Sequence, residues 1–286
     1  MTDLFANPAI QSGAVPFLIA LVTAAVLGFS ATISTRFAGL AVLAGFLAAN
    51  ALIFGLPPLP PKSSGQKIAY IALMAGLTGL LLDAVRAHSG RRALVGWIVS
   101  TLAIGWLGWR KLMADPSPEH LSMGLLLIGA IIVLAATERR SDDPADKTVP
   151  LLIVSIAVAV IAFFGASASI AQNAGALAAS LGGVLILNWP KRRFGLDATA
   201  RLTSLVVLIA LVSQMTLFTT SPAWVPILLI PALFADRLAG RFISADSPAA
   251  PLFRPVLITF LAAVPAAAAI TAAWYAASSS GLSGGY

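Results

Sequence analysis

The chain has 286 residues, of which 59% are hydrophobic and only 10% are charged, and its mean hydropathy is +0.93. Soluble domains are about 45–50% apolar and about 25% charged, so a soluble fold would lack the charged surface to cover this chain in water. The composition therefore predicts an all-α, polytopic integral membrane protein, because a helix satisfies its own backbone hydrogen bonds in lipid.

The same composition argues against several classes of function. Cysteine is absent and only two histidines occur, which argues against thiol chemistry, haem and multi-histidine metal sites, so we expect no metal and no cofactor. The net charge of +7 resembles that of a nucleic-acid-binding protein. Its cations, however, lie in short loops between apolar runs, which is typical of the positive-inside rule, and we expect no nucleic-acid partner. The N-terminus lacks the basic region and cleavage site of a secretory signal.

In chain order, five spans are predicted before residue 140. They occupy 15–34, 37–55, the apolar run that starts at Ile68, a run that starts near Ala93, and 121–136. The third ends at Asp83 and Arg86, followed by the loop 87–92. The fourth ends at two tryptophans beside Arg110 and Lys111, a pattern typical of an interfacial anchor.

The second half of the chain is predicted to hold five more spans. Residues 149–187 are almost unbroken apolar or small residues, about 39 in number, and one helix of that length would measure about 58 Å. This is nearly twice the thickness of a hydrocarbon core, about 30 Å, so the run must fold back, and 165–169 is the expected turn. Further spans follow at 202–218, 225–238 and 255–277, and Pro265 is expected to kink the last.

The distribution of cations tests this ten-span plan. With the N-terminus outside, the inner loops hold fourteen of the 18 Lys and Arg residues, and the outer segments hold Lys62, Lys67, Arg110 and Lys111. The inner cations are Arg36, Arg86, Arg91, Arg92, Arg139, Arg140, Lys147, Lys191, Arg192, Arg193, Arg201, Arg237, Arg241 and Arg254. This bias predicts a bacterial-type inner or plasma membrane location with both termini outside. Residues 1–286 form one transmembrane domain, with flexible ends expected at 1–14 and 278–286.

Similar patterns in the two halves indicate an internal repeat. Spans 1–4 and 7–10 share an arginine at the start of the second member, a proline-bearing outer turn, and an acid followed by arginine at the end of the third, as in LLLDAVR and LFADRLAGR. A 4+2+4 plan with two parallel halves is one interpretation. The other is that hydrophobic helices of similar polarity align this well by chance.

Two carboxylates lie at the edges of apolar runs. An acid within a membrane marks a functional site by default, but Asp83 and Asp236 are predicted at inner ends, beside Arg86 and Arg237. The sequence favours interfacial ion pairs, Asp83 with Arg86 and Asp236 with Arg237, over proton or cation coupling. No ionisable group is expected near the middle of the membrane.

Uncharged polar residues provide the candidate solute contacts. The seventh span carries Gln172 and Asn173 together with small residues at positions 175, 179 and 183, a spacing that lets helices approach closely. Tight packing is one interpretation, and amides at the edge of a cavity are the other. If the repeat is real, Asn50 and Gln214 occupy related places and form a shared site near the midplane. Interhelical hydrogen bonding is the commoner use of such residues, and we favour it.

Two functions from different classes remain. The chain holds no nucleotide-binding or hydrolase motif and no extramembrane segment long enough for a catalytic domain, so we expect no enzyme. We favour a small permease or flippase-like carrier for an uncharged, zwitterionic or lipidic solute, with Asn50, Gln172, Asn173 and Gln214 as speculative substrate contacts. The alternative is a non-catalytic structural or assembly subunit that packs against other membrane proteins. Membrane lipids are expected partners in either case.

Overall fold

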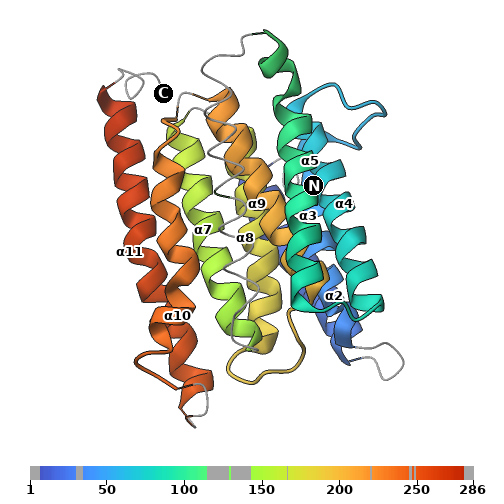
Figure 1. Ribbon diagram of the computed structural model, residues 1–286, viewed down its shortest axis with the longest axis vertical. Coiled ribbons are helices and arrows are strands. Elements are labelled where there is room, and N and C mark those ends of the chain that lie inside the picture. Colours follow the sequence, from blue (N-terminus) through green and yellow to red (C-terminus); the bar gives the residue numbers. More distant parts are fainter. Residues whose placement is uncertain are drawn as a thin grey trace.

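The computed structural model describes residues 7–29, 35–114, 143–165, 167–219, 221–244 and 249–279, together with Gly129 and Ser247. Every regular element in these ranges is a helix, and the long helices run side by side as one bundle (Figure 1). In the first half these are the π-helix η1 (Ile10–Ala14), α2 (Val15–Phe29), the 3₁₀ helix η2 (Thr35–Gly39), α3 (Leu40–Phe54), α4 (Ser64–Ala84) and α5 (Ser89–Ala114). In the second half they are α7 (Pro144–Phe164), α8 (Ala168–Asn188), α9 (Ala198–Phe218), the 3₁₀ helix η3 (Val225–Phe234), α10 (Ala235–Ala239) and α11 (Ala250–Ser279).

Eight helices among the described residues are long and apolar enough to cross a membrane. Four of them have 21 residues, which corresponds to about 31 Å and matches a hydrocarbon core of about 30 Å. The fold-back predicted at 165–169 is present, since α7 ends at Phe164 and α8 begins at Ala168. Apart from Gly129, the predicted span at 121–136 lies outside the described residues, so the total of ten spans stays a prediction.

The predicted ninth span has an unexpected backbone. It consists of η3, a ten-residue 3₁₀ helix, followed directly by the short α10. Runs of 3₁₀ helix beyond three or four residues are uncommon. Pro231 provides a physical reason, because it lies inside the element and lacks the N–H that an α-helix needs there.

The N-terminal segment also differs from the expectation of a flexible end. Residues 10–14 form η1, which continues into α2 without a break. Ser12 in η1 lies next to α8, close to Gly175. Pro265 lies inside α11, which is continuous from Ala250 to Ser279.

Local sequence signals fix where two of the helices begin. Ser63 caps α4: its hydroxyl accepts the N–H of Gln66, and the Gln66 side chain accepts the N–H of Ser63. Asp143 caps α7 by accepting the N–H of Ala145, with Pro144 in the first helical position.

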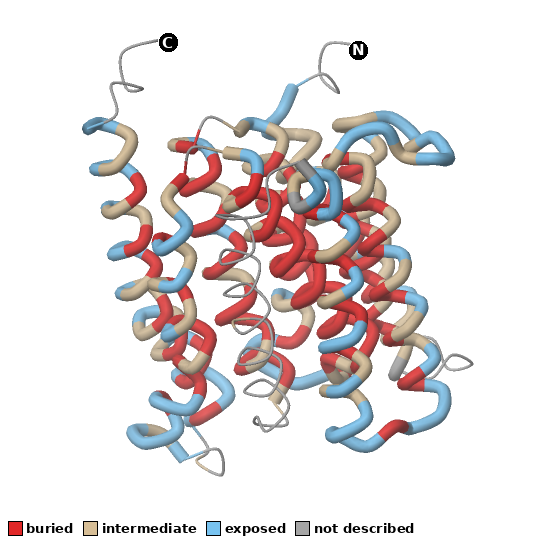
Figure 2. Tube along the Cα trace, turned by 45° about the horizontal axis from the view of Figure 1, so that its top comes forward, coloured by how far each residue is buried: buried red, intermediate tan, exposed pale blue. Residues whose placement is uncertain are grey.

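Consecutive helices run in opposite directions within α2–α5 and again within α7–α11, which gives the bundle two distinct ends. We call the end where α9 begins the basic end, and the opposite end the terminal end, because both described chain ends lie there (Figure 2). α4 ends and α5, α7 and α11 begin at the basic end. The exposed cations at the basic end are Arg86, Arg91, Lys191, Arg192, Arg193, Arg237 and Arg241, whereas the terminal end has Lys62 and Arg110. The described cations therefore follow the predicted alternation; which side of a membrane each end faces stays a prediction.

Helix α9 lies at the centre of the bundle. It packs against α3, α4, α5, α7 and α8. In its most apolar stretch 83% of the residues are buried, compared with 17% in the span Ile10–Phe29 (Figure 2). Such enclosure requires close helix contacts, which small residues permit. A Cβ atom added to Gly79 of α4 would lie 2.5 Å from Cα of Thr199 in α9, and one added to Gly183 of α8 would lie 2.5 Å from the carbonyl oxygen of Phe17 in α2.

The two halves proposed as a repeat agree in direction but differ in packing. α2–α5 and the series α8, α9, η3–α10 and α11 each begin at the terminal end and alternate in the same way. In the first half, however, α4 packs along α9 of the other half, whereas its counterpart η3–α10 packs on α7 and α11. The 4+2+4 repeat stays a hypothesis.

Candidate functional site

A buried chain of amides joins α3 to α8. Asn50 Nδ2 donates to Asn173 Oδ1 at 2.9 Å, and Asn173 Nδ2 donates to the backbone carbonyl of Ser169 at 3.1 Å. Both asparagines are 1% exposed. Asn50 lies four residues before the end of α3 and Asn173 five residues after the start of α8, so the pair is about 6–8 Å inside the terminal end. This level is about halfway between the terminal end and the midplane, whereas the sequence placed Asn50 near the midplane.

Only the nitrogen of the Asn50 amide forms a hydrogen bond with a described residue. Its oxygen, Oδ1, is buried and accepts no hydrogen bond in the described structure. An unsatisfied buried polar atom costs about 1–3 kcal/mol, so such an atom calls for an explanation. The oxygen is an unused acceptor within the apolar bundle.

Gln214 forms a separate interhelical contact. Its Nε2 donates to the hydroxyl oxygen of Ser64 at 2.8 Å, which joins α9 to α4, and its Oε1 is buried and accepts no hydrogen bond from the described residues. Asn50 and Gln214 therefore bind different partners, and the structure does not join them directly. Each makes the kind of interhelical hydrogen bond that we favoured from the sequence. Gln172, next to Asn173 on α8, is half-buried.

η1 lies beside the amide chain at the terminal end. Gln11 Nε2 donates to the carbonyl oxygen of Leu52 in α3 at 3.5 Å, and Ser12 lies close to Gly175 in α8. Leu52 and Gly175 are each two residues beyond an asparagine of the pair. The π-helical turn thus packs against the two helices that the amide chain joins.

Asp83 has a different partner from the one expected. Its Oδ1 accepts the N–H of Ala198 at 2.9 Å, and its Oδ2 accepts the N–H and the hydroxyl of Thr199 at 2.8 and 2.7 Å. The carboxylate is 4% exposed and satisfies the first backbone donors of α9, where the helix dipole also favours a negative charge. Arg86 is exposed just beyond α4, with φ of 51°. The hydrogen bonds of Asp83 therefore go to α9, which replaces the ion pair with Arg86 as our account of this acid.

Asp236 and Arg237 occupy different environments although they are adjacent. Asp236 is 2% exposed, whereas Arg237 is exposed and its guanidinium lies 5.2 Å from the centre of the Phe234 ring. Both belong to α10, at the basic end.

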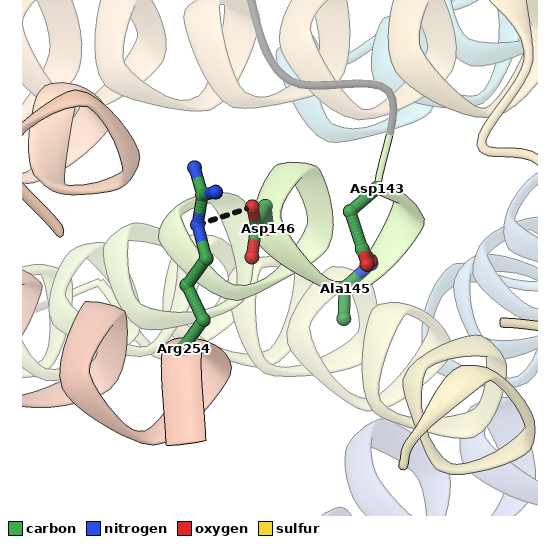
Figure 3. Close-up of polar contacts among 4 residues, drawn as sticks. All are labelled: Asp143, Ala145, Asp146 and Arg254. Carbon is green, nitrogen blue, oxygen red and sulfur yellow. Dashed lines mark hydrogen bonds and ion pairs between the residues drawn. The ribbon is translucent and has the colours of Figure 1, made fainter. Parts of the chain in front are cut away.

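An ion pair that the sequence reasoning missed joins α7 to α11. Arg254 Nε lies 2.8 Å from Asp146 Oδ2, and the two side chains are 9% and 1% exposed (Figure 3). Asp146 is in the first turn of α7, where a negative charge is favoured. From the sequence, Asp146 belongs to the charged loop before the sixth span and Arg254 to the polar loop before the tenth. The available signal was their position, one at the start of each apolar run.

Potential metal ligands do not gather in the described part of the chain. No group of three or more His, Cys, Asp or Glu side chains there has an arrangement able to hold a metal ion. The polar features described above are thus the amide contacts of Asn50 and Gln214 towards the terminal end, and the buried acids Asp83, Asp146 and Asp236 at the basic end.

Comparison with known protein families, with curated proteins and with solved structures found no match to this chain. The long apolar helices and their packing nevertheless define its class. It is a multi-pass helical membrane protein.

Proposed function

We propose that this protein is a small carrier for an uncharged, zwitterionic or lipidic solute. The observation that carries the proposal is the buried Oδ1 of Asn50, an acceptor inside the bundle to which no described residue donates. Polar groups within membrane spans are costly, and when they face a bundle interior they often belong to a solute path. A solute that binds this oxygen would account for it.

The chemistry of the site favours a solute without net charge. The amide chain consists of Asn50, Asn173 and the Ser169 carbonyl, all uncharged. Asp83 and Asp146 lie at the opposite end of the bundle, where they bind α9 and Arg254. An ion that binds at these amides would therefore be far from the carboxylates of Asp83 and Asp146. Without a nearby opposite charge, its desolvation makes ion binding costly.

The backbone of η3 supports a protein that changes conformation. Stretches of 3₁₀ helix often mark hinges, and interrupted helices are typical of secondary transporters. η3 and α10 pack between α7 and α11. A hinge at Pro231 would let this side of the bundle move relative to the enclosed α9.

The scaffold function is the second candidate, and the outer helices favour it. The first span and α11 are the least enclosed of the candidate spans, with 17% and 28% of their most apolar windows buried. Phe260, Trp274 and Tyr275 of α11 are strongly exposed. Such a face suits lipid or another membrane subunit equally well.

We further propose an inner or plasma membrane location, with the basic end in the cytoplasm and both termini outside. Exposed Lys191, Arg192 and Arg193 would then lie beside the anionic leaflet, where each cation near the surface is worth about 1 kcal/mol. Lipids are accordingly the partners we propose. We propose no catalytic activity.

Flux into proteoliposomes tests the carrier. The probes are myo-inositol, glycine betaine and a short-chain fluorescent phosphatidylcholine, one for each class of solute. We expect at least one to move faster than in protein-free liposomes, and Asn50→Leu to slow it. Thr271→Val is the matched control, because Thr271 is exposed on α11 and bonds only to its own helix.

A structural scaffold is expected to transport none of these probes. If none of the probes moves and other membrane subunits co-purify in fixed ratio in mild detergent, the carrier proposal fails and the scaffold becomes the primary function.

A further inference from the structure

The direction of the hydrogen bonds in the amide chain limits what Asn50 can bind. We infer that the solute group received at Asn50 is a neutral hydrogen-bond donor, so that the solute class is one with hydroxyl or amide N–H groups. This inference rests on the proposed carrier function and narrows it. It excludes solutes with a quaternary ammonium group, such as glycine betaine, and lipids with a choline head group, because these groups have no hydrogen-bond donor.

The backbone carbonyl of Ser169 determines the direction of the hydrogen bonds between the amides. The carbonyl of Ser169 can only accept, so Asn173 must present its Nδ2 to it, and this leaves Asn173 Oδ1 for its neighbour. Asn50 must then present Nδ2 to that oxygen, at 2.9 Å. The last atom of this series of hydrogen bonds, to which no described residue donates, is consequently the acceptor Asn50 Oδ1. Turning either amide over would place two acceptors or two donors face to face.

Gln214 adds an acceptor of the same kind on the neighbouring helix. It is 4% exposed, lies four residues before the end of α9, and has an unused Oε1. α3 and α9 pack together, and both amides lie in the part of these helices nearest the terminal end. Its bond to Ser64 does not fix its direction, because a hydroxyl both donates and accepts. Asn50 therefore carries the inference, and Gln214 is a second contact for a solute with several donors.

Charge at the site favours a neutral donor over an ammonium group. An ammonium needs a carboxylate or several strong acceptors when it leaves water. The chain offers one carboxamide oxygen at Asn50, and its other members are already bonded to each other. A hydroxyl or amide N–H is matched by a single acceptor.

Access requires movement of the bundle. Asn50 is 1% exposed, so the solute reaches its oxygen only when neighbouring helices separate. η1 is the element best placed to move, because it is a single π-helical turn that packs at this level against α3 and α8. Such turns are frequent at functional sites.

Binding of matched solutes to the purified full-length chain tests the inference. The pairs are myo-inositol with its hexa-O-methyl ether, and urea with tetramethylurea; each ether or methylated member accepts but does not donate. Glycine betaine is the zwitterion without a donor. We expect a donor-bearing member to bind and its methylated partner to bind at least about 5-fold more weakly, the effect of one hydrogen bond.

Variants add a second readout. Asn50→Leu should weaken binding of the donor solute at least about 5-fold. Thr271→Val, which changes an exposed side chain on α11 that bonds within its own helix, should leave it unchanged. The solute pairs need no variant, so the test remains decisive if Asn50→Leu fails to fold.

The outcomes separate this inference from the carrier proposal. Equal binding of a solute and its methylated partner, or no binding by either donor solute, overturns the inference. Flux of betaine or tetramethylurea without donor binding leaves a carrier but overturns the neutral-donor class. Binding of inositol or urea without flux supports a site for donor solutes at Asn50 and contradicts the carrier proposal.

Discussion

The carboxylate of Asp83 lies against the first turn of α9, where Thr199 donates both its backbone N–H and its hydroxyl to Oδ2, at 2.8 and 2.7 Å. A side chain at the end of α4 thus completes the hydrogen bonding of a helix that begins more than a hundred residues later. Because α9 is the central helix, this contact fixes the basic end of the whole bundle.

Replacement of Asp83 should therefore destabilise the fold. Asp83→Ala removes three hydrogen bonds and leaves buried donors at Ala198 and Thr199, at a cost of about 2–3 kcal/mol. Thermal unfolding in mild detergent measures the loss. Asp83→Asn should cost less, since its amide oxygen still accepts one of these donors.

Arg86→Ala is the control for Asp83. Its side chain is exposed, and we expect a change within about 0.5 kcal/mol. If Arg86→Ala destabilises the protein as much as Asp83→Ala, an ion pair between them is the better account.

The buried pair of Asp146 and Arg254 predicts strong non-additivity. Asp146→Ala leaves the buried guanidinium of Arg254 without this carboxylate, and we expect it to cost about 3–5 kcal/mol. Arg254→Ala removes the same contact and should also destabilise the protein. The double variant Asp146→Leu with Arg254→Met should be more stable than either single one, because no lone charge remains. A double-mutant cycle in detergent measures the coupling, and additive single effects would argue against a direct interaction.

The close contact of α4 with α9 predicts a size limit at Gly79. A Cβ atom there would lie 2.5 Å from Cα of Thr199 and 2.9 Å from the carbonyl oxygen of Ala198, and backbone atoms cannot rotate away. Gly79→Ala should destabilise the protein by about 1–3 kcal/mol. Gly105→Ala on α5 is the matched control, because nothing lies within 4 Å of its Cβ position, and it should be neutral or slightly stabilising. Equal stability of the two variants would contradict the packing.

The absence of cysteine makes the orientation directly testable. Leu56→Cys places a thiol in an 87% exposed position at the terminal end, and His88→Cys places one at the exposed basic end. With the basic end in the cytoplasm, a membrane-impermeant thiol reagent added to intact cells should label only Leu56→Cys. Labelling of His88→Cys alone would reverse the orientation.

Features set by local composition were the ones that the sequence predicted well. The apolar runs gave the long helices, and the length of 149–187 required the turn found after Phe164. The backbone of 225–239 was not foreseen, although Pro226 and Pro231 were visible, because neither proline alone determines which hydrogen-bonding pattern replaces the α-helix.

Partners of buried polar groups were predicted poorly. Asp83 was matched with Arg86 because they are three residues apart, but its hydrogen-bond partners are 115 and 116 residues away. Asn50 was matched with Gln214 by an apparent repeat, whereas the fold places it against Asn173, 123 residues along the chain. Such contacts depend on which helices pack together, and hydropathy contains no information on that choice.

The bond between Asp83 and α9 also sets an order for biogenesis. The chain emerges at about 5–20 residues per second, so an interval of 115 residues corresponds to about 6–23 s between synthesis of the carboxylate and of its partners. During this time α4 must be held at the membrane with its acid solvated by water, lipid head groups or a chaperone. The face of α4 that α9 covers therefore stays without this partner until α9 is synthesised and packs against α4 and α5.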